Sequence, residues 1–312
     1  MHYRQLGTTG LNVSELCFGS LSVGPAQYNL TSKAAQGVLD FAWDLGVRFY
    51  DTAELYGTYG LLKDIAAREG AIIASRSFAF DSRGMRESLD RARKELSRDR
   101  IEIFGLHEQE SGLTLKGHRD ALEYLVRQRE KGVIQAIAVS THYVDCVRAA
   151  AMLDEVDVIF AILNVAGLGI RGGSRTDMEN ALRFAREMGK GVYIMKALGG
   201  GHLYREARKA LEYARDFPHK DSVAVGLHTR SEVEFAVRVF SGERTSTESA
   251  SEGESKRRLI VEDWCEGCGE CVKVCGFGAL TLSDGTAQVD TSKCMLCGYC
   301  ARVCPHFCLK VV

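Results

Sequence analysis

The C-terminal part of the chain is crowded with cysteine. Eight of the 11 cysteines form two runs with the same C-x-x-C-x-x-C-x-x-x-C spacing: Cys265, Cys268, Cys271 and Cys275, then Cys294, Cys297, Cys300 and Cys304. Structural zinc usually takes its thiolates from two separated C-x-x-C pairs, and a disulfide framework needs an oxidising compartment. The spacing therefore favours iron–sulfur clusters over both alternatives.

The spacing of each run is that of the bacterial ferredoxins. There, three closely spaced cysteines hold one [4Fe-4S] cluster and the fourth cysteine of the run crosses to the other cluster. The expected ligand sets are Cys265, Cys268, Cys271 and Cys304 for cluster I, and Cys294, Cys297, Cys300 and Cys275 for cluster II. Pro305 follows the second run, whereas Gly276 stands where the first run would carry proline. Because that residue shapes a turn and is no ligand, we expect both clusters.

Length and charge narrow the class of protein. The 312 residues are enough for one large domain and one small one. A net charge of -1 argues against a nucleic-acid binder, which needs a basic surface. The N-terminal segment does not read as a signal peptide, and no apolar run approaches a membrane span. We expect a cytoplasmic protein that binds neither nucleic acid nor membrane, with Cys17, Cys146 and Cys308 as small buried apolar residues.

Residues 241–258 are rich in Ser, Thr and Glu and predict a flexible linker, which divides the chain into domains at 1–240 and 259–312. Before the linker, short apolar strands alternate with amphipathic helices such as Gly84–Ser97 and Asp177–Met188. The predicted strands are Leu16–Gly19, Arg48–Thr52, Ala71–Arg76, Ile101–His107, Ile134–Ser140, Val156–Asn164, Gly191–Lys196 and Ser222–Leu227. Eight strands favour a (β/α)8 barrel with its active site at the carboxyl ends of the strands. An open doubly wound sheet is the alternative, but no G-x-G-x-x-G turn follows the first strand.

Polar residues end two of the predicted strands. Asp51 closes the second strand in FYDTAELYG, Tyr56 follows five residues later, and His107 closes the fourth strand in IEIFGLHEQE. With the opening YRQLGTTGLNVSELCFGS, these segments resemble the aldo-keto reductases, and specifically a subgroup with a C-terminal ferredoxin-like module. The resemblance implies that Tyr56 protonates a substrate carbonyl, with Asp51 as the supporting carboxylate and His107 as the orienting imidazole. The environment must lower the pKa of such a phenol for catalysis near neutral pH.

The sequence departs from the family at several of its functional positions. Arg76 stands where the family has lysine, and a planar guanidinium does not fill the space of a compact ammonium. Ser140 and Asn164 match residues that hold the nicotinamide carboxamide, whereas Thr141 replaces an asparagine and Phe160 replaces a glutamine. We therefore expect NADP(H) binding to be weaker than in a reductase with an intact site.

Two sequence features, after the seventh and the eighth predicted strands, suggest an anion-binding site. Gly199, Gly200 and Gly201 follow the seventh strand, at the usual phosphate site of such barrels, and could turn backbone N–H groups toward a phosphate. They are equally consistent with a simple turn. Arg230, after the eighth strand, could meet a 2′-phosphate, or it could be a solvated arginine at the start of a helix.

Four of the 8 histidines follow predicted strands: His107, His142, His202 and His228. Together with a carboxylate they could ligate a divalent metal ion, although independent polar loop residues would give the same pattern.

The leading hypothesis is an oxidoreductase that acts on a small carbonyl or alcohol and exchanges electrons through the clusters. A nicotinamide moves two electrons as hydride whereas a cluster passes one, so a flavin could also be present, and a redox partner protein could supply the electrons. The alternatives are an electron-transfer or interaction protein with a catalytically retired barrel, and a metal-dependent enzyme that uses the histidines.

Overall fold

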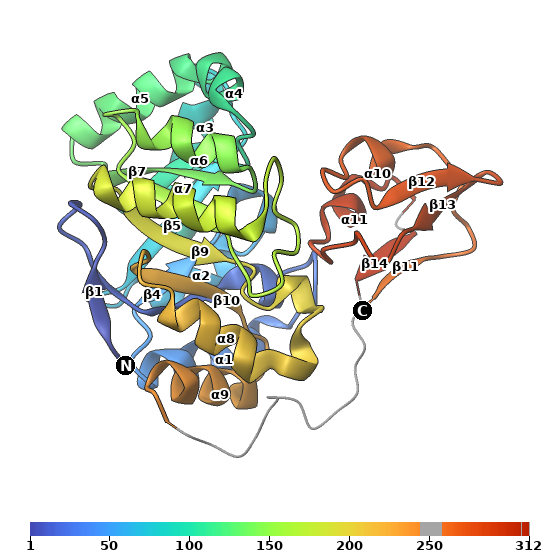
Figure 1. Ribbon diagram of the computed structural model, residues 1–312, viewed down its shortest axis with the longest axis horizontal. Coiled ribbons are helices and arrows are strands. Elements are labelled where there is room, and N and C mark those ends of the chain that lie inside the picture. Colours follow the sequence, from blue (N-terminus) through green and yellow to red (C-terminus); the bar gives the residue numbers. More distant parts are fainter. Residues whose placement is uncertain (244–257, 307, 312) are drawn as a thin grey trace.

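Eight parallel strands close into a barrel in the computed structural model, which describes residues 1–243, 258–306 and 308–311 (Figure 1). Around the barrel the order is β10-β3-β4-β5-β6-β7-β8-β9, and each neighbouring pair is parallel. The strands are β3 (Leu16–Gly19), β4 (Phe49–Asp51), β5 (Ile72–Ser77), β6 (Ile101–Leu106), β7 (Ile134–Thr141), β8 (Val158–Ile162), β9 (Gly191–Met195) and β10 (Ser222–Gly226). The predicted (β/α)8 barrel is confirmed, and the open-sheet alternative is wrong.

Every residue of β5 and β6 is buried, as expected for parallel strands between a packed interior and a ring of helices. A helix follows each strand and packs on the outside of the barrel (Figure 1). The helices are α1 (Ser32–Asp44), α2 (Tyr59–Ala66), α3 (Ser82–Leu96), α4 (Gly112–Gly117), α5 (Arg119–Glu130), α6 (Val144–Ala151), α7 (Arg175–Glu187), α8 (Ala207–Asp216) and α9 (Arg230–Phe240).

Capping side chains set where the predicted helices begin. Asp81 accepts a hydrogen bond from the backbone of Gly84, so α3 starts two residues before its apolar pattern does. Ser174 forms a capping box with Asp177 and starts α7.

A β-hairpin lies at the amino ends of the barrel strands. It consists of β1 (Tyr3–Gln5) and β2 (Asn12–Ser14), and its turn packs against Gly191 at the start of β9. The hairpin leaves the carboxyl ends of the strands free for functional side chains.

The cysteine-rich segment folds as a separate small unit with short helices and paired strands. β11 (Leu259–Val261) pairs with β14 (Leu309–Val311), and β12 (Leu280–Ser283) pairs with β13 (Thr286–Val289). The helices are α10 (Glu270–Lys273) and α11 (Tyr299–Val303). This unit is the predicted α+β ferredoxin-like domain. Of the predicted linker 241–258, positions 244–257 lie outside the described residues.

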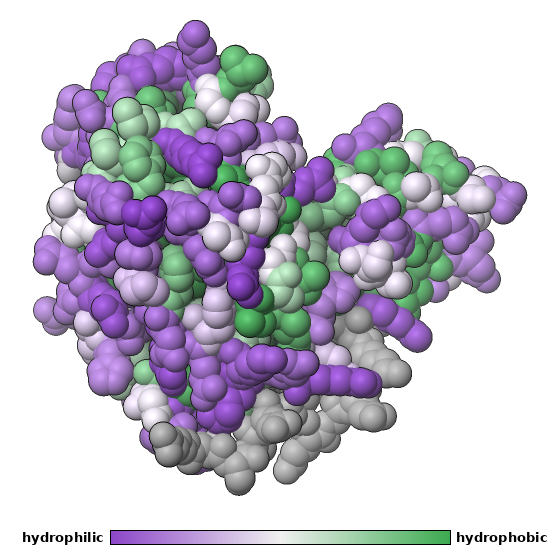
Figure 2. Space-filling view, in the orientation of Figure 1, coloured by the Kyte–Doolittle hydropathy of each residue, from purple (hydrophilic) through white to green (hydrophobic). Residues whose placement is uncertain are grey.

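The small unit sits against the carboxyl ends of the barrel strands, and a notch separates the two bodies on the face shown in Figure 2. Gln27 Nε2 donates to the carbonyl oxygen of Leu296 at 3.3 Å. Gly298 passes so close to the carbonyl oxygen of Ala26 that an added Cβ would lie 2.3 Å from it. No helix in the described parts of the chain has the length and apolar character needed to cross a membrane.

Candidate active site and cluster sites

Four polar side chains predicted from the sequence meet where β4, β5 and β6 end. Asp51 ends β4, Arg76 lies near the end of β5, and His107 follows β6 directly. Tyr56 ends a short 3-10 helix, η2 (Glu54–Tyr56). Arg76 donates to both carboxylate oxygens of Asp51, at 2.6 and 3.1 Å, and to the Tyr56 hydroxyl at 2.6 Å. Asp51, Arg76 and Tyr56 therefore form one hydrogen-bonded unit.

The guanidinium of Arg76 lies on an aromatic surface. Its central carbon is 4.6 Å from the ring centre of Phe160, and Phe160 stacks on Tyr193 at 3.9 Å. Tyr193 in turn donates its hydroxyl hydrogen to Asp51 at 3.0 Å. Planar guanidinium groups favour such stacking. Phe160 thus supplies the surface on which Arg76 lies in the position that lysine has in the resembling family.

Burial sets the protonation of the two groups that would face a substrate oxygen. It raises the pKa of Tyr56 to about 12, against the opposing effect of Arg76, so the phenol keeps its proton. Burial and Arg76 both lower the pKa of His107 well below its usual range, so the imidazole is neutral. The ring of Phe78 stacks on His107 at 4.3 Å. The pKa of Tyr56 is thus raised and not lowered as expected from the sequence. The protonated phenol can still donate to an oxygen, with Arg76 beside it to stabilise the charge that remains.

A fifth side chain enters this site from the small unit. The hydroxyl of Tyr299, at the start of α11, lies 3.3 Å from His107 Nε2. Burial raises the pKa of Tyr56 and of Glu108, and the proximity of the Tyr299 hydroxyl lowers both in part. Tyr299 lines the cluster II cavity between Cys297 and Cys300. Sequence reasoning did not single out Tyr299, and the one signal it carried was an aromatic residue between two expected cluster ligands.

A cavity lies beside the tyrosine and opens toward the later strands. Its walls include Asp51, Tyr56 and Phe160 from the barrel and Met295 and Leu296 from the small unit. The cavity could therefore hold a flat cofactor ring between Tyr56 and the segment that carries the cluster II cysteines.

Three residues predicted to contact a nicotinamide cofactor have other partners and are not among those that line this cavity. The Ser140 hydroxyl accepts the backbone N–H of Glu108 at 2.9 Å, and the Asn164 amide makes two hydrogen bonds with the backbone of Leu168. Arg230 donates to the carbonyl oxygen of Gly37, on α1. The groups predicted to hold a carboxamide and a 2′-phosphate are thus engaged in local structure.

The glycine loop after β9 packs against the small unit. Gly200 and Gly201 line the cavity, and Gly199 is buried. An added Cβ on Gly200 would lie 2.1 Å from the carbonyl oxygen of Met295. Close approach of the two units requires glycine here, whether or not the loop also binds a phosphate.

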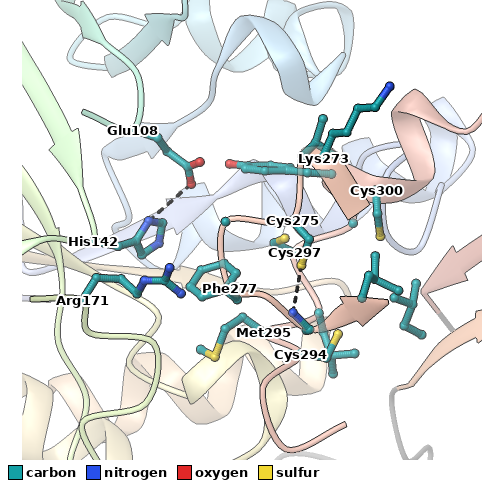
Figure 3. A pocket seen from close by; sticks show the side chains of 18 of the residues that line it. Glu108, His142, Arg171, Lys273, Cys275, Phe277, Cys294, Met295, Cys297 and Cys300 are labelled. Carbon is teal, nitrogen blue, oxygen red and sulfur yellow. Dashed lines mark hydrogen bonds and ion pairs between the residues drawn. The ribbon is translucent and has the colours of Figure 1, made fainter. Parts of the chain in front are cut away.

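The eight cysteines of the two runs gather in two places. One cavity is lined by Cys265, Cys268, Cys271 and Cys304, and the other by Cys275, Cys294, Cys297 and Cys300. Figure 3 shows the second group around a common space, with Glu108 and His142 of the barrel facing it. These are the two expected ligand sets, including the crossing of the fourth cysteine. Four thiols around each space fit a [4Fe-4S] cluster, in which each thiolate binds a different iron.

A ninth cysteine lies beside the first group. Cys308 also lines that cavity, and its sulfur is 3.2 Å from that of Cys304. It is buried, as expected, but it packs against cluster ligand positions and not only against apolar residues.

The four histidines at the barrel mouth do not share one centre. His202 bonds to the carbonyl oxygen of Cys294, and His228 pairs with Glu232 at 2.8 Å. His142 lies 3.4 Å from Glu108, close to His107. Within residues 1–243, 258–306 and 308–311, no three His, Cys, Asp or Glu side chains converge to hold a single metal ion. The structure therefore gives no support to the metal-dependent alternative.

Three of the six non-glycine residues with positive φ in the described parts of the chain lie where the two units meet. Glu108, Lys196 and Leu296 all have a positive φ, of 45°, 57° and 50°. Non-glycine residues rarely adopt this conformation, which persists where the surrounding structure requires it and is common at functional sites. Leu296 lines both the cavity beside Tyr56 and the cluster II cavity, which ties the two sites together.

Comparison with known proteins agrees with this architecture. The Aldo/keto reductase family matches residues 15–259, and the 4Fe-4S dicluster domain matches residues 257–305. The oxidoreductase YrpG of Bacillus subtilis is 27% identical over 236 residues, 67% of this chain and 70% of the relative. A D-threo-aldose 1-dehydrogenase of a Pseudomonas species is 25% identical over 186 residues, 48% of this chain and 56% of the relative.

A solved aldo-keto reductase from Bacillus halodurans superposes with a TM-score of 0.65 at 19% identity, covering 82% of this chain and 99% of that one, and so shares the fold. The family match spans most of the chain, and the strand order and the C-terminal cysteine pattern agree with it. This chain belongs to the aldo/keto reductase family of oxidoreductases and carries a C-terminal 4Fe-4S dicluster domain.

Proposed function

We propose that the barrel interconverts a carbonyl and an alcohol at Tyr56, with electrons supplied through the small unit. The observation that carries the proposal is the hydrogen-bonded unit of Asp51, Arg76 and Tyr56. The Tyr56 ring lies 5.9 Å from that of the neutral His107, which Tyr299 of the cluster II segment meets at 3.3 Å. The Pseudomonas relative is named a dehydrogenase of an aldose, which agrees with carbonyl and alcohol chemistry.

Each residue of the site has a defined task. Tyr56 donates its proton to the substrate oxygen as the carbonyl is reduced. Arg76, 2.6 Å from the phenol oxygen, stabilises the negative charge left there, and Asp51 balances the charge of Arg76. His107 Nε2 orients the substrate oxygen. When bound, the [4Fe-4S] clusters would supply single electrons, and a flavin or nicotinamide would supply an electron pair.

The orientation of the small unit indicates where an electron-donor protein would bind. The cluster II cysteines face the barrel, whereas Cys268 of the cluster I group is exposed. A redox partner protein would therefore meet the cluster I side of the small unit.

One observation favours a second candidate function. Ser140 and Asn164 are engaged with the backbone, and Tyr299 occupies the mouth of the barrel. These contacts would suit an electron-transfer protein whose barrel no longer reduces a substrate.

Anaerobic turnover separates the two candidates. The full chain with loaded clusters is supplied with reduced methyl viologen and benzaldehyde, and benzyl alcohol is measured by chromatography. Aldehyde, two electrons and two protons give the alcohol, so product formation should match viologen oxidation. Replacing Tyr56 with Phe should lower turnover about a hundredfold or more, because it removes the transferable proton.

The matched control is Tyr59→Phe. Tyr59 is also buried, but its hydroxyl forms a hydrogen bond with the Ser75 hydroxyl, away from the barrel mouth. It should keep most of the turnover. If wild-type protein with full clusters forms no benzyl alcohol, the electron-transfer candidate is the better one. Equal turnover in wild type and Tyr56→Phe would remove Tyr56 from the mechanism.

A further inference from the structure

The hydroxyl of Tyr299 lies where a substrate oxygen would have to bind. A substrate carbonyl must reach both the Tyr56 hydroxyl and His107 Nε2. The Tyr299 hydroxyl lies 3.3 Å from the second, and it is near enough to the first to lower the pKa of Tyr56 against the larger effect of burial. Two oxygen atoms cannot share this position, so Tyr299 and a bound substrate oxygen exclude one another.

Contacts on both sides of Tyr299 hold it in place. Just before it, Gly298 packs against the carbonyl oxygen of Ala26. Cys297 precedes this glycine and Cys300 follows Tyr299, and both line the cluster II cavity. The tyrosine side chain is therefore positioned by the docking of the whole small unit and is not a freely rotating surface group.

The surroundings of Tyr299 are aromatic. Its ring meets the edge of His107, with ring centres 6.2 Å apart and planes at 85°. Phe78 of the barrel and Phe277 of the small unit line the same cavity. A group that replaces the tyrosine would thus enter a space shaped for a flat ring that carries one oxygen.

We propose that Tyr299 is a resident occupant of the substrate-oxygen site and that an aromatic carbonyl or alcohol displaces it when it binds. The inference rests on the proposed function and deepens it, because it names a substrate class and makes the small unit part of the active site. Docking of residues 294–300 and binding of substrate then compete for the barrel mouth.

Calorimetry with benzyl alcohol as the probe tests the competition in the anaerobic, oxidised full chain with loaded clusters. Tyr299→Ala should bind the probe at least about tenfold more tightly than wild type, because the Tyr299 hydroxyl no longer occupies the position of the probe oxygen. The double variant with Tyr299→Ala and Tyr56→Phe should lose most of this gain in affinity. No gain in Tyr299→Ala, or a gain that survives Tyr56→Phe, would overturn the proposal.

His202→Ala is the matched control. His202 bonds to the backbone carbonyl oxygen of Cys294 in the small unit, so its loss loosens docking, but it is not among the residues that line either cavity at the barrel mouth. The control should leave the affinity within about twofold of wild type. A gain equal to that of Tyr299→Ala would mean that loosened docking, and not the freed oxygen site, increases binding, and would refute the assignment.

Hydrogen–deuterium exchange in the wild-type protein tests displacement without any substitution. Saturating benzyl alcohol should raise exchange severalfold in residues 294–300, and Tyr56→Phe should suppress the rise. Unchanged exchange with bound probe would overturn the proposal. Both measurements detect binding alone, so displacement of Tyr299 without benzaldehyde turnover would retain this inference and reject the proposed function.

Discussion

Replacing Arg76 with methionine should destabilise the barrel by about 3–5 kcal/mol, because it leaves a buried carboxylate without its charged partner. The side chains of Arg76 and Asp51 are only 3% and 4% exposed. Without Arg76, the carboxylate of Asp51 keeps the Tyr193 hydroxyl, while the carbonyl oxygen of Thr52 and the Tyr56 hydroxyl each lose a donor. Methionine has a similar length, so the cost comes mainly from the unpaired charge and only slightly from lost packing.

Guanidinium-induced unfolding measures this loss of stability, provided that the fluorescence signal comes from the barrel alone. The chain has 2 tryptophans, Trp43 in the barrel and Trp264 in the small unit, so a Trp264→Phe background leaves fluorescence from Trp43 only. In that background Asp51→Asn should recover part of the stability lost in Arg76→Met, because it removes the unpaired charge. The control Arg83→Met breaks an exposed pair, 89% and 63% exposed, and should change stability by about 0.5 kcal/mol or less. A loss below about 1 kcal/mol in Arg76→Met would show that the pair does not behave as a buried one.

Two further measurements address the cofactors. Cys275→Ser should remove or alter the cluster held by the second run, visible by electron paramagnetic resonance, and lower iron from about eight atoms per chain toward four. Loss confined to the first-run cluster would contradict the crossing of ligands, and four irons or fewer in fully loaded wild type would contradict the two-cluster assignment. NADPH should bind one or two orders of magnitude more weakly than to a reductase with an intact site, because loss of two buried hydrogen bonds costs about 1–3 kcal/mol. Calorimetry that shows submicromolar affinity, together with hydride transfer to a simple aldehyde, would restore the ordinary reductase mechanism.

The barrel and the core of its site could be predicted because simple patterns determine them. Short apolar runs between amphipathic helices predicted eight parallel strands, and closure of a barrel brings the ends of those strands together. Asp51, Arg76 and His107 lie at such ends, so a topological argument was enough to place them near one another. Locality explains the three closely spaced cysteines of each group, whereas the crossing of Cys275 and Cys304 was expected only from the resemblance of the spacing to that of bacterial ferredoxins.

Side-chain direction at the loops could not be predicted. Ser140 and Asn164 stand at the strand ends that the resemblance indicated, yet Ser140 bonds to the backbone of the loop after β6 and Asn164 to the backbone of its own loop. Tyr299 meets His107 across 192 residues of sequence and a domain boundary. No periodicity or spacing carries information on such a contact, which depends on how two separately folded units dock.

Arg76 and Phe160 show how two departures from a family pattern can be one structural change. Considered separately, Arg76 replaces the compact ammonium of the family's lysine, and Phe160 replaces the amide of a glutamine. In the folded chain the guanidinium lies over the Phe160 ring and still donates to both Asp51 and Tyr56. A glutamine at position 160 would offer no aromatic face to that flat group, whereas the phenylalanine does. The pair thus retains the contacts that prepare Tyr56 to donate a proton while it removes a partner for a nicotinamide carboxamide. That combination is what a barrel would need if it kept its oxygen chemistry and received electrons from the iron–sulfur domain at its mouth.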